Sequence, residues 1–423
     1  MATIITGASV TTEGIVTNTL GTSNFVAGVN AGNSIVSGGN SNTLVGTNAG
    51  AAITTGDNNT AVGSDSLSSN TTGSENTSIG VNTLNVNTTG SNNVALGRNA
   101  GASNTTASNN TAVGYAALLL NTTGTRNTAV GRNALAANTT ASENTAVGYI
   151  AGDSITTGTK NNLFGDSAGT SITTGGQNVA VGNAALSTAT TSSSNTAIGQ
   201  GALTSNSTGA VNAALGSLAG SSITTGSANT TIGYSAGNYT TAITTGDSNT
   251  IVGAYGHTSS ASGTHQICLG YDVNSAGNNT VTIGKGHGSS TRIYNTFTSN
   301  ATWTHSSDER LKKEISSNND CGLDFINALR TVTYKWKAPS ELDTSMYNYN
   351  ADNSSVEYDK KMYGFIAQEV KAAMDTHNIT DFAGYSKLED GIDNIEGISY
   401  EMFVVPLLKA VQELSARIEA LEA

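Results

Sequence analysis

An apolar residue followed by glycine recurs every 17 residues over much of the chain. An asparagine stands four residues before each of these glycines, as Asn59 stands before Gly63. The spacing holds for twelve consecutive glycines, at positions 46, 63, 80, 97, 114, 131, 148, 165, 182, 199, 216 and 233. A fixed period of this length predicts a stacked repeat, in which single units are too small to fold alone and neighbouring units bury a continuous apolar column.

Each repeat predicts a short strand followed by turns. Thr60, Ala61 and Val62 alternate polar with apolar or small side chains, which favours a strand, and Gly63 supplies the backbone freedom that a tight corner needs. Residues 41–253 are therefore predicted to form a mainly β rod, a parallel β-solenoid or β-roll. Twelve coils, each rising about 4.8 Å, span on the order of 55–60 Å. The recurrent asparagines are predicted to be turn residues that stack into a hydrogen-bonded ladder.

The rhythm changes after Gly233, because the next glycine of the series, Gly253, follows at a spacing of 20. Residues 254–303 are richer in aromatic and imidazole side chains, and we interpret them as a cap that closes the stack. Alternatively, they form a distal tip that contacts a receptor, because planar side chains anchor interfaces and stack on sugars. Residues 1–40 are out of phase and are predicted to attach the rod to a larger assembly. The candidate receptor-contacting residues are Tyr255, His257, Tyr271 and Tyr294.

Composition divides the chain near residue 300. Residues 1–306 hold six Lys or Arg and nine Asp or Glu, whereas residues 307–423 hold 12 and 21, so a nearly uncharged rod precedes an acidic globular segment. The net charge of −12 disfavours nucleic-acid partners and anionic membranes. Cys268 and Cys321 match no metal or disulfide spacing, so no metal and no cofactor are expected. We expect no signal peptide and no membrane insertion.

The repeat Asn-Thr-Ala-Val-Gly, as in residues 127–131, resembles the head repeats of trimeric autotransporter adhesins and similar repeats in phage tail fibres. The resemblance implies a parallel β-roll in which three chains associate around one axis. It also suggests that the small inner residues suit close packing between chains: Ala61, Ala112, Ala129 and Ala146.

Residues 304–423 carry several motifs in order: residues 307–312, which read Ser-Asp-Glu-Arg-Leu-Lys, then residues 332–336 and 363–370. Together they resemble the intramolecular chaperone auto-processing (peptidase) domain found at the C-terminus of endosialidases and phage tail fibres, a small α+β domain. The resemblance implies that Ser307 is a nucleophile, Lys312 its general base, and the bond between Ser306 and Ser307 the cleavage site. Asp308 and Arg310 match the motif and are expected to support the loop.

The chemistry suits these residue types. A serine hydroxyl attacks a carbonyl once a base takes its proton, and lysine is such a base when burial or nearby charge disfavours its ammonium form. Taken alone, the motif favours a helix N-terminus with acidic residues in its first turn, followed by solvated lysines. The downstream motifs favour self-cleavage, which is a single-turnover reaction; whether the protein is an enzyme in any wider sense stays open.

A C-terminal helix over residues 399–423 is predicted from apolar residues that step by four and three. This is the seam of a coiled coil, and with about two heptads it is too short to be stable alone. The helix either packs on its own domain or, as the resemblance implies, joins a trimeric bundle. The seam residues are Leu407, Val411, Leu414, Ile418 and Leu421.

The sequence thus favours a homotrimeric phage tail fibre that contacts the host surface, assembled in the host cytoplasm and carried on the virion. Its expected partners are other tail or baseplate proteins, through the N-terminal segment, and a host glycan or protein receptor. One alternative is a polysaccharide-degrading tailspike with the same chaperone, which would need two carboxylates in a cleft. Another is a bacterial trimeric adhesin.

Overall fold

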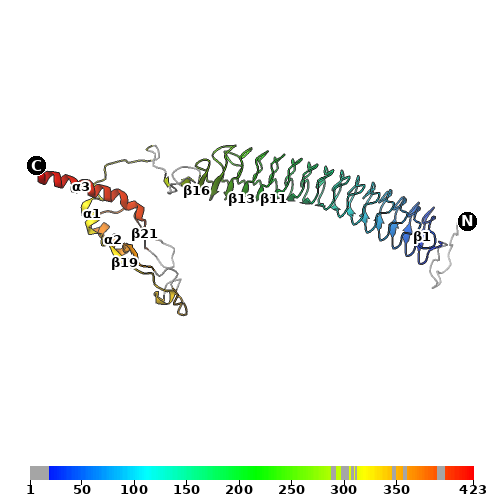
Figure 1. The fold of residues 1–423 in the computed structure, drawn as a ribbon, viewed down its shortest axis with the longest axis horizontal. Coiled ribbons are helices and arrows are strands. Elements are labelled where there is room, and N and C mark those ends of the chain that lie inside the picture. The colour runs from blue at the N-terminus through cyan, green and yellow to red at the C-terminus, as the bar shows by residue number, and fades with distance from the viewer. Residues whose placement is uncertain are drawn as a thin grey trace. The chain divides into compact units, whose positions relative to one another are not determined.

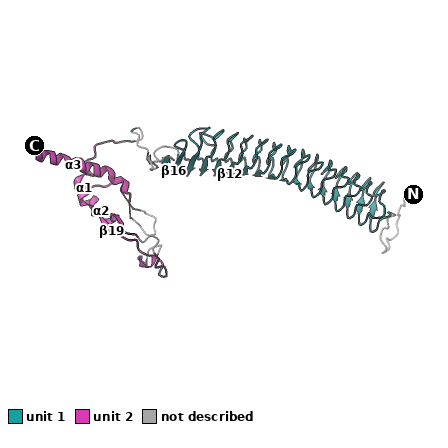
Figure 2. Ribbon diagram, in the orientation of Figure 1, with its two compact units in different colours: residues 1–311 teal, residues 312–423 magenta. Residues whose placement is uncertain are grey.

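The structure is a computed structural model of the 423-residue chain. It describes residues 19–286, 292–296, 304–305, 309, 312–344, 349–355, 360–387 and 396–423. The chain divides into two compact units, residues 1–311 and residues 312–423 (Figure 2).

The first unit is a parallel β-solenoid in which each coil contributes one three-residue strand to a continuous sheet (Figure 1). Successive strands pair in parallel and in the same register, so that Thr111 lies opposite Thr128 and Ala112 opposite Ala129. The predicted solenoid of 17-residue repeats is confirmed. The strands of the regular stack are β1 (Phe25–Ala27), β2 (Thr43–Val45), β3 (Thr60–Val62), β4 (Thr77–Ile79), β5 (Val94–Leu96), β6 (Thr111–Val113), β7 (Thr128–Val130), β8 (Thr145–Val147), β9 (Asn162–Phe164), β10 (Val179–Val181), β11 (Thr196–Ile198), β12 (Ala213–Leu215), β13 (Thr230–Ile232) and β14 (Thr250–Val252).

The parallel stack extends past both ends of the predicted rod. β1 pairs with β2 at a spacing of 18 residues, inside the predicted attachment segment. Beyond β14, the strands β15 (Gln266–Leu269) and β16 (Thr280–Gly284) continue the parallel ladder inside the predicted cap. The direction reverses only at β17 (Arg292–Thr296), which is antiparallel to β16 and pairs with β18 (Thr304–His305). Coils that are longer or shorter than 17 residues keep the same strand register because the difference in length lies in their turns.

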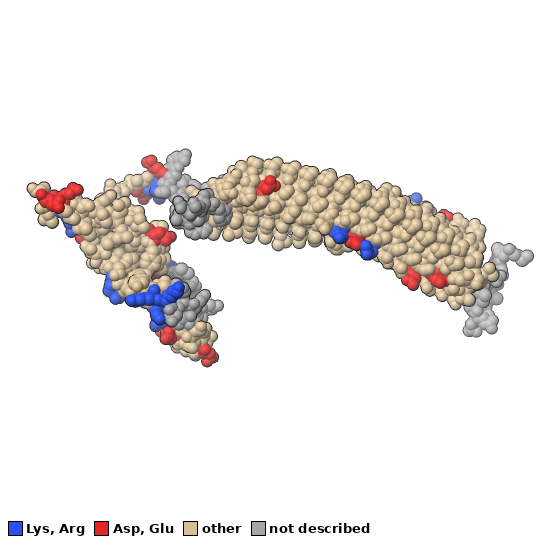
Figure 3. Space-filling model, viewed as in Figure 1, with Lys and Arg blue, Asp and Glu red and all other residues tan. Residues whose placement is uncertain are grey.

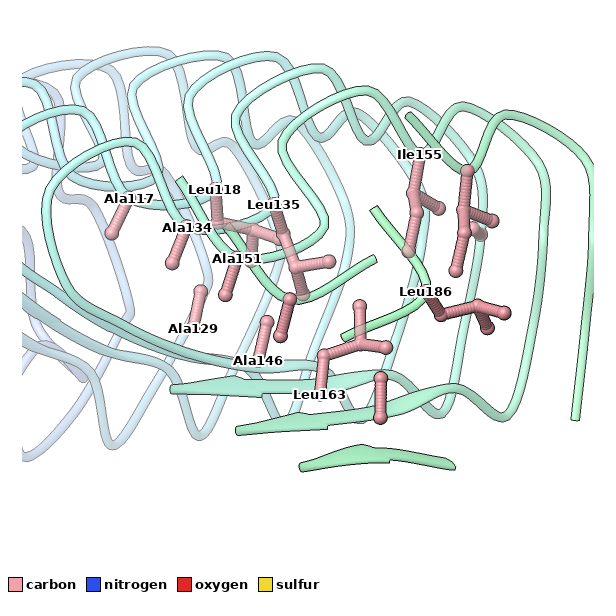
Figure 4. Close-up of a cluster of buried hydrophobic side chains, with 14 of the residues drawn as sticks. Ala117, Leu118, Ala129, Ala134, Leu135, Ala146, Ala151, Ile155, Leu163 and Leu186 are labelled. Atoms are coloured by element: carbon pink, nitrogen blue, oxygen red, sulfur yellow. The ribbon is translucent and has the colours of Figure 1, made fainter. Parts of the chain in front are cut away.

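The core is an apolar column that runs through the coils (Figure 4). The middle residue of each strand points inward, and a second row of small residues, such as Ala134, lies across from it. Larger side chains such as Leu135 and Ile155 belong to the same column and are fully buried. Because each coil supplies only a few buried residues, the column is stable only as a stack.

The sequence suggested that the inner alanines pack between chains, but in the structure they pack inside a single chain. They are at most 2% exposed inside a single chain, because the second residue of each strand faces the coil interior. That expectation is wrong for Ala61, Ala112, Ala129 and Ala146 alike.

The recurrent asparagines form the predicted ladder. The Asn127 backbone N–H donates to Asn110 Oδ1 over 2.9 Å. The Asn127 side chain accepts from the Asn144 N–H at 3.0 Å and donates to the Ala141 carbonyl at 2.8 Å. All of these asparagines are buried, so the ladder satisfies backbone groups that water cannot reach. A second ladder, not foreseen from the sequence, links the amides of Asn70, Asn87, Asn104, Asn121 and Asn138 at 2.8–3.1 Å.

The glycine after each strand is required by its conformation and its surroundings. Gly131 has a φ of 134°, a region that side chains other than glycine rarely adopt. A Cβ at this position would lie 2.2 Å from the carbonyl oxygen of Gly148 in the next coil. The coils therefore approach each other as closely as the backbone allows at this corner, which explains the strict phase of glycine in the sequence.

The second unit is a small α+β fold with its own core. Phe325, Val370, Met374 and Phe403 meet in that core and are almost fully buried. Two antiparallel strand pairs, β19 with β20 and β21 with β22, accompany the helices. The elements are α1 (Leu323–Ala328), β19 (Val332–Tyr334), the short 3₁₀ helix η3 (Pro339–Glu341), β20 (Met362–Gly364), α2 (Ala367–Thr376), β21 (Tyr385–Lys387), β22 (Glu396–Ile398), the 3₁₀ helix η4 (Tyr400–Phe403) and α3 (Val404–Glu422).

Candidate functional sites

Tyrosine side chains gather on the rod where the 17-residue rhythm breaks. Tyr255 lies at the centre, with ring centroids 5.3 Å from Tyr234, 4.9 Å from Tyr239 and 5.7 Å from Tyr271. The three outer rings are 42–59% exposed, whereas Tyr255 is half-buried between them. We call these four residues the aromatic patch. They come from three successive coils, so the stacking of the solenoid assembles the patch.

The 20-residue coil between β13 and β14 creates this arrangement. It carries a longer connection after Gly237, which the hydrogen bond from the Ile243 N–H to the Gly237 carbonyl closes at 2.9 Å. This connection places Tyr239 over the ring of Tyr255. Sequence reasoning found Tyr255 and Tyr271 but missed Tyr234 and Tyr239. The change in spacing from 17 to 20 was the available signal.

His257 supports the aromatic patch from the interior of the rod. Its imidazole is fully buried, with Nε2 2.7 Å from the hydroxyl of Thr240, and its ring stacks on Tyr239 at 6.4 Å. The predicted receptor-contacting histidine therefore holds the longer connection in place and does not face solvent. Tyr294 lies elsewhere, on β17 opposite Thr282.

The aromatic patch has the chemistry of a binding surface. Burial raises the pKa of Tyr255 above its ordinary value, and its neighbours Tyr234, Tyr271 and Tyr239 raise it further. The phenol therefore stays neutral and available for hydrogen bonds over the physiological range. Exposed tyrosine rings offer apolar faces beside polar hydroxyls, a combination that suits ligands with both characters.

The predicted cleavage site falls mostly outside the described residues: Ser306, Ser307, Asp308 and Arg310. Lys312 is described, opens the second unit and has an exposed side chain. The predicted pairing of Ser307 with Lys312 therefore stays a prediction.

The helices of the second unit are tied together by polar contacts around their core. Glu413 of α3 accepts a hydrogen bond from the Leu323 N–H, at the start of α1, over 2.8 Å. This bond, helped by Lys409 and Arg417, holds the pKa of Glu413 below its usual value. Arg330 and Glu369 form a two-point ion pair that joins the residues after α1 to α2.

An open cavity of about 550 Å³ lies on the second unit. The side chains of Tyr334, Trp336, Phe365 and Tyr400 line it, and the Tyr400 hydroxyl accepts a hydrogen bond from the Phe365 N–H at 3.1 Å. These four aromatic residues lie beside aliphatic residues such as Leu342 and Ile398 and charged residues such as Lys335 and Glu396, so the hollow has both apolar and charged sides.

The predicted seam of the C-terminal helix faces away from its own domain. The buried residues of α3 are Pro406 and Ala410. The seam residues Leu407, Val411, Leu414, Ile418 and Leu421 are 47–86% exposed. Within one chain, α3 therefore packs on its domain through another face, and the seam stays uncovered.

Residues 307–379 match the model of a protein family described as chaperone of endosialidase. Comparisons with curated proteins and with solved structures found no match. A β-solenoid rod of 17-residue repeats followed by a segment similar to the chaperone of endosialidase fits a tail-fibre or tailspike type of protein with an intramolecular chaperone.

Among the described residues, no group of histidine, cysteine and carboxylate side chains could hold a metal ion. The described helices include none that is long and apolar enough to cross a membrane.

Proposed function

We propose that three copies of the chain form a phage tail fibre that binds the host surface, and that the C-terminal chaperone cleaves itself from the fibre between Ser306 and Ser307. The match of residues 307–379 to the chaperone family, on a chain whose other unit is a repeat rod, carries this proposal. Assembly would take place in the host cytoplasm, with the N-terminal segment attached to other tail or baseplate proteins.

The exposed seam of α3 supports the trimer. A two-heptad seam exposes enough apolar surface to favour association, and a bundle of three copies would bury it. The chaperone would also set the register in which the three rods align. Because the coils of the rod are nearly identical, three rods could align in many registers, each one coil apart. Chaperone units that trimerise first hold the three chains level and reduce the entropy lost when the rods associate.

The proposed cleavage uses one serine and one lysine. The Ser307 hydroxyl oxygen attacks the Ser306 carbonyl carbon while Lys312 takes the hydroxyl proton. The peptide bond breaks, the Ser307 amine leaves with a proton, and an ester links the two residues until water hydrolyses it. A lysine acts as a base when burial disfavours its charge. Because Lys312 is exposed in the single chain, we expect the assembled trimer to supply that burial.

Cleavage is tested by weighing the full chain and its Ser307→Ala variant under denaturing and native conditions. We expect the native mass of both to be that of a trimer. The denatured wild type should split into fragments of residues 1–306 and 307–423, and the variant should stay at 42.7 kDa. An uncut wild-type trimer would remove the cleavage step and leave a retained trimerisation domain. A monomer would contradict the assembly.

The aromatic patch is the proposed receptor contact, and a carbohydrate of the host surface is the proposed ligand. Tyrosine faces stack on the apolar faces of sugar rings, and the phenol groups bond to sugar hydroxyls. Replacing Tyr239 and Tyr271 by alanine should abolish binding of the fibre to host cells. Tyr149→Ala is the matched control, because Tyr149 is equally exposed but lies outside the patch. Equal loss of binding in both variants would contradict the assignment.

A further inference from the structure

The outward side of the rod's sheet carries an apolar side chain in every coil, at the third position of the strand. The third residue of each strand points away from the core, and its side chain remains accessible. Among the larger ones, Ile79, Leu96, Phe164 and Leu215 are 37–50% exposed. We call the outward first and third residues of β2 to β14 the strand face. Its third-position row is Val45, Val62, Ile79, Leu96, Val113, Val130, Val147, Phe164, Val181, Ile198, Leu215, Ile232 and Val252.

The strand face also carries no charge. None of its residues is Asp, Glu, Lys or Arg, and most of its first-position residues are threonine. The charged residues of the described rod lie in the turns, where Arg126 and Glu143 form an ion pair at 2.7 Å. Figure 3 shows how sparse such side chains are on the visible side of the rod. Rows of uncharged and mostly β-branched side chains are more typical of a protein interaction surface than of a surface that faces only solvent.

The size of the strand face is that of an interface. Twelve intervals of about 4.8 Å give a length of roughly 58 Å, and three residues give a width of about 10 Å. The area of the apolar row and the threonine row together is therefore on the order of 600 Å². It approaches the roughly 800 Å² that one partner contributes to a stable complex.

We propose that the strand face packs against the strand faces of other copies of this chain, side by side and coil for coil. The proposal rests on the proposed homotrimer and names the surface through which its rods associate. A partner must offer apolar contacts at the same spacing over the whole length. A parallel copy of the rod has that spacing by construction, and cyclic symmetry brings the same face of each copy to the axis.

The strand face also contains a marker of register. Six third-position residues are larger than valine and lie on β4, β5, β9, β11, β12 and β13: Ile79, Leu96, Phe164, Ile198, Leu215 and Ile232. Their spacing along the rod is uneven, so a shift by one or more whole coils leaves at least one of them without an equally large partner. Only the unshifted alignment brings all six sets of large residues level. The chaperone would set this alignment, and the strand face would keep it after cleavage.

Cysteine cross-linking tests the surface and its register. In a Cys321→Ser background, which leaves only the buried Cys268, we would compare Val130→Cys on the strand face with Thr140→Cys on an exposed turn of the same coil. With a short thiol-specific cross-linker, Val130→Cys should give linked chains in more than tenfold excess over Thr140→Cys. Chains carrying Val130→Cys mixed with chains carrying Val147→Cys, one coil away, should link more weakly than matched chains.

A charge placed on the strand face gives a second measurement. Leu215→Lys should dissociate or misalign the rods, whereas Thr225→Lys, exposed on a turn of the same coil, should not. A trimeric protein that cross-links through position 140 but not position 130, and tolerates lysine at 215, would overturn this proposal and leave the proposed trimer intact. A monomeric wild type would instead contradict the trimer itself.

Discussion

Replacing Asn127 by alanine should destabilise the solenoid locally and strongly. The variant deprives the buried Asn144 N–H, which donates to Oδ1, of its partner. The Ala141 carbonyl loses the bond from Nδ2 of Asn127 but keeps the bond from Asn138 Nδ2 at 3.1 Å. A buried polar group left without a partner costs about 1–3 kcal/mol, so the expected loss is about 1–3 kcal/mol. The neighbouring residue provides the control. Arg126 forms an exposed ion pair with Glu143, and Arg126→Ala should cost no more than about 1 kcal/mol.

Hydrogen exchange is the appropriate assay, because a repeat rod does not unfold as one cooperative unit. In Asn127→Ala, the amide of Asn144 and its neighbours in the same coils should exchange at least about five-fold faster, the factor that corresponds to about 1 kcal/mol. Coils several units away should keep their protection. If Asn127→Ala exchanges like Arg126→Ala, or if protection is lost evenly along the rod, the ladder does not stabilise the coils in the way described.

Three further predictions concern other parts of the chain. Gly131→Ala should destabilise its coils by more than about 2 kcal/mol, measured by hydrogen exchange of their amides, because φ is 134° and the new methyl group meets the Gly148 carbonyl; unchanged exchange would mean that the corner relaxes. Phe325→Ala should cost the second unit about 3–5 kcal/mol in urea unfolding and leave the rod unchanged, because Phe325 is 1% exposed in that unit's core. The pKa of Glu413 is lower in the folded state, so its contribution to stability is present above the ordinary glutamate pKa of about 4.3 and is lost as the pH falls through the folded value. Glu413→Gln should reduce the change of the urea-unfolding midpoint with pH in that acidic window. An unchanged pH profile would assign the pH dependence of stability to other groups.

The architecture of the rod follows from its sequence because one strict period controls strand, corner and ladder together. Gly131 and Asn127 each occupy a position that only their residue type fills, so their recurrence is informative. The inward or outward direction of each strand residue was less clear. Ala129 and Val130 are both apolar, and only the structure shows that the smaller one is buried and the larger one faces outward.

The candidate sites were predicted only in part, for physical reasons. Tyr239 and Tyr255 meet because a longer connection brings one coil over the next, which a list of aromatic residues does not reveal. In the second unit, the order of motifs was enough to indicate the chaperone family. The bond between Glu413 and Leu323 spans 90 residues and depends on how α3 packs on α1, which no local pattern encodes.

The identical bonding of successive coils makes the length of this fibre adjustable in discrete steps. Tandem repeats at the gene level invite unequal recombination, and a gain or loss of one whole 17-residue unit leaves every ladder contact between an equivalent pair of atoms. Each such event would lengthen or shorten the reach of the fibre by about 4.8 Å without a new fold. Insertions of other sizes survive only in the turns, as the 20-residue coil shows, and there they add new side chains to the surface. One lineage could thus vary how far it reaches and what it touches by separate mutations.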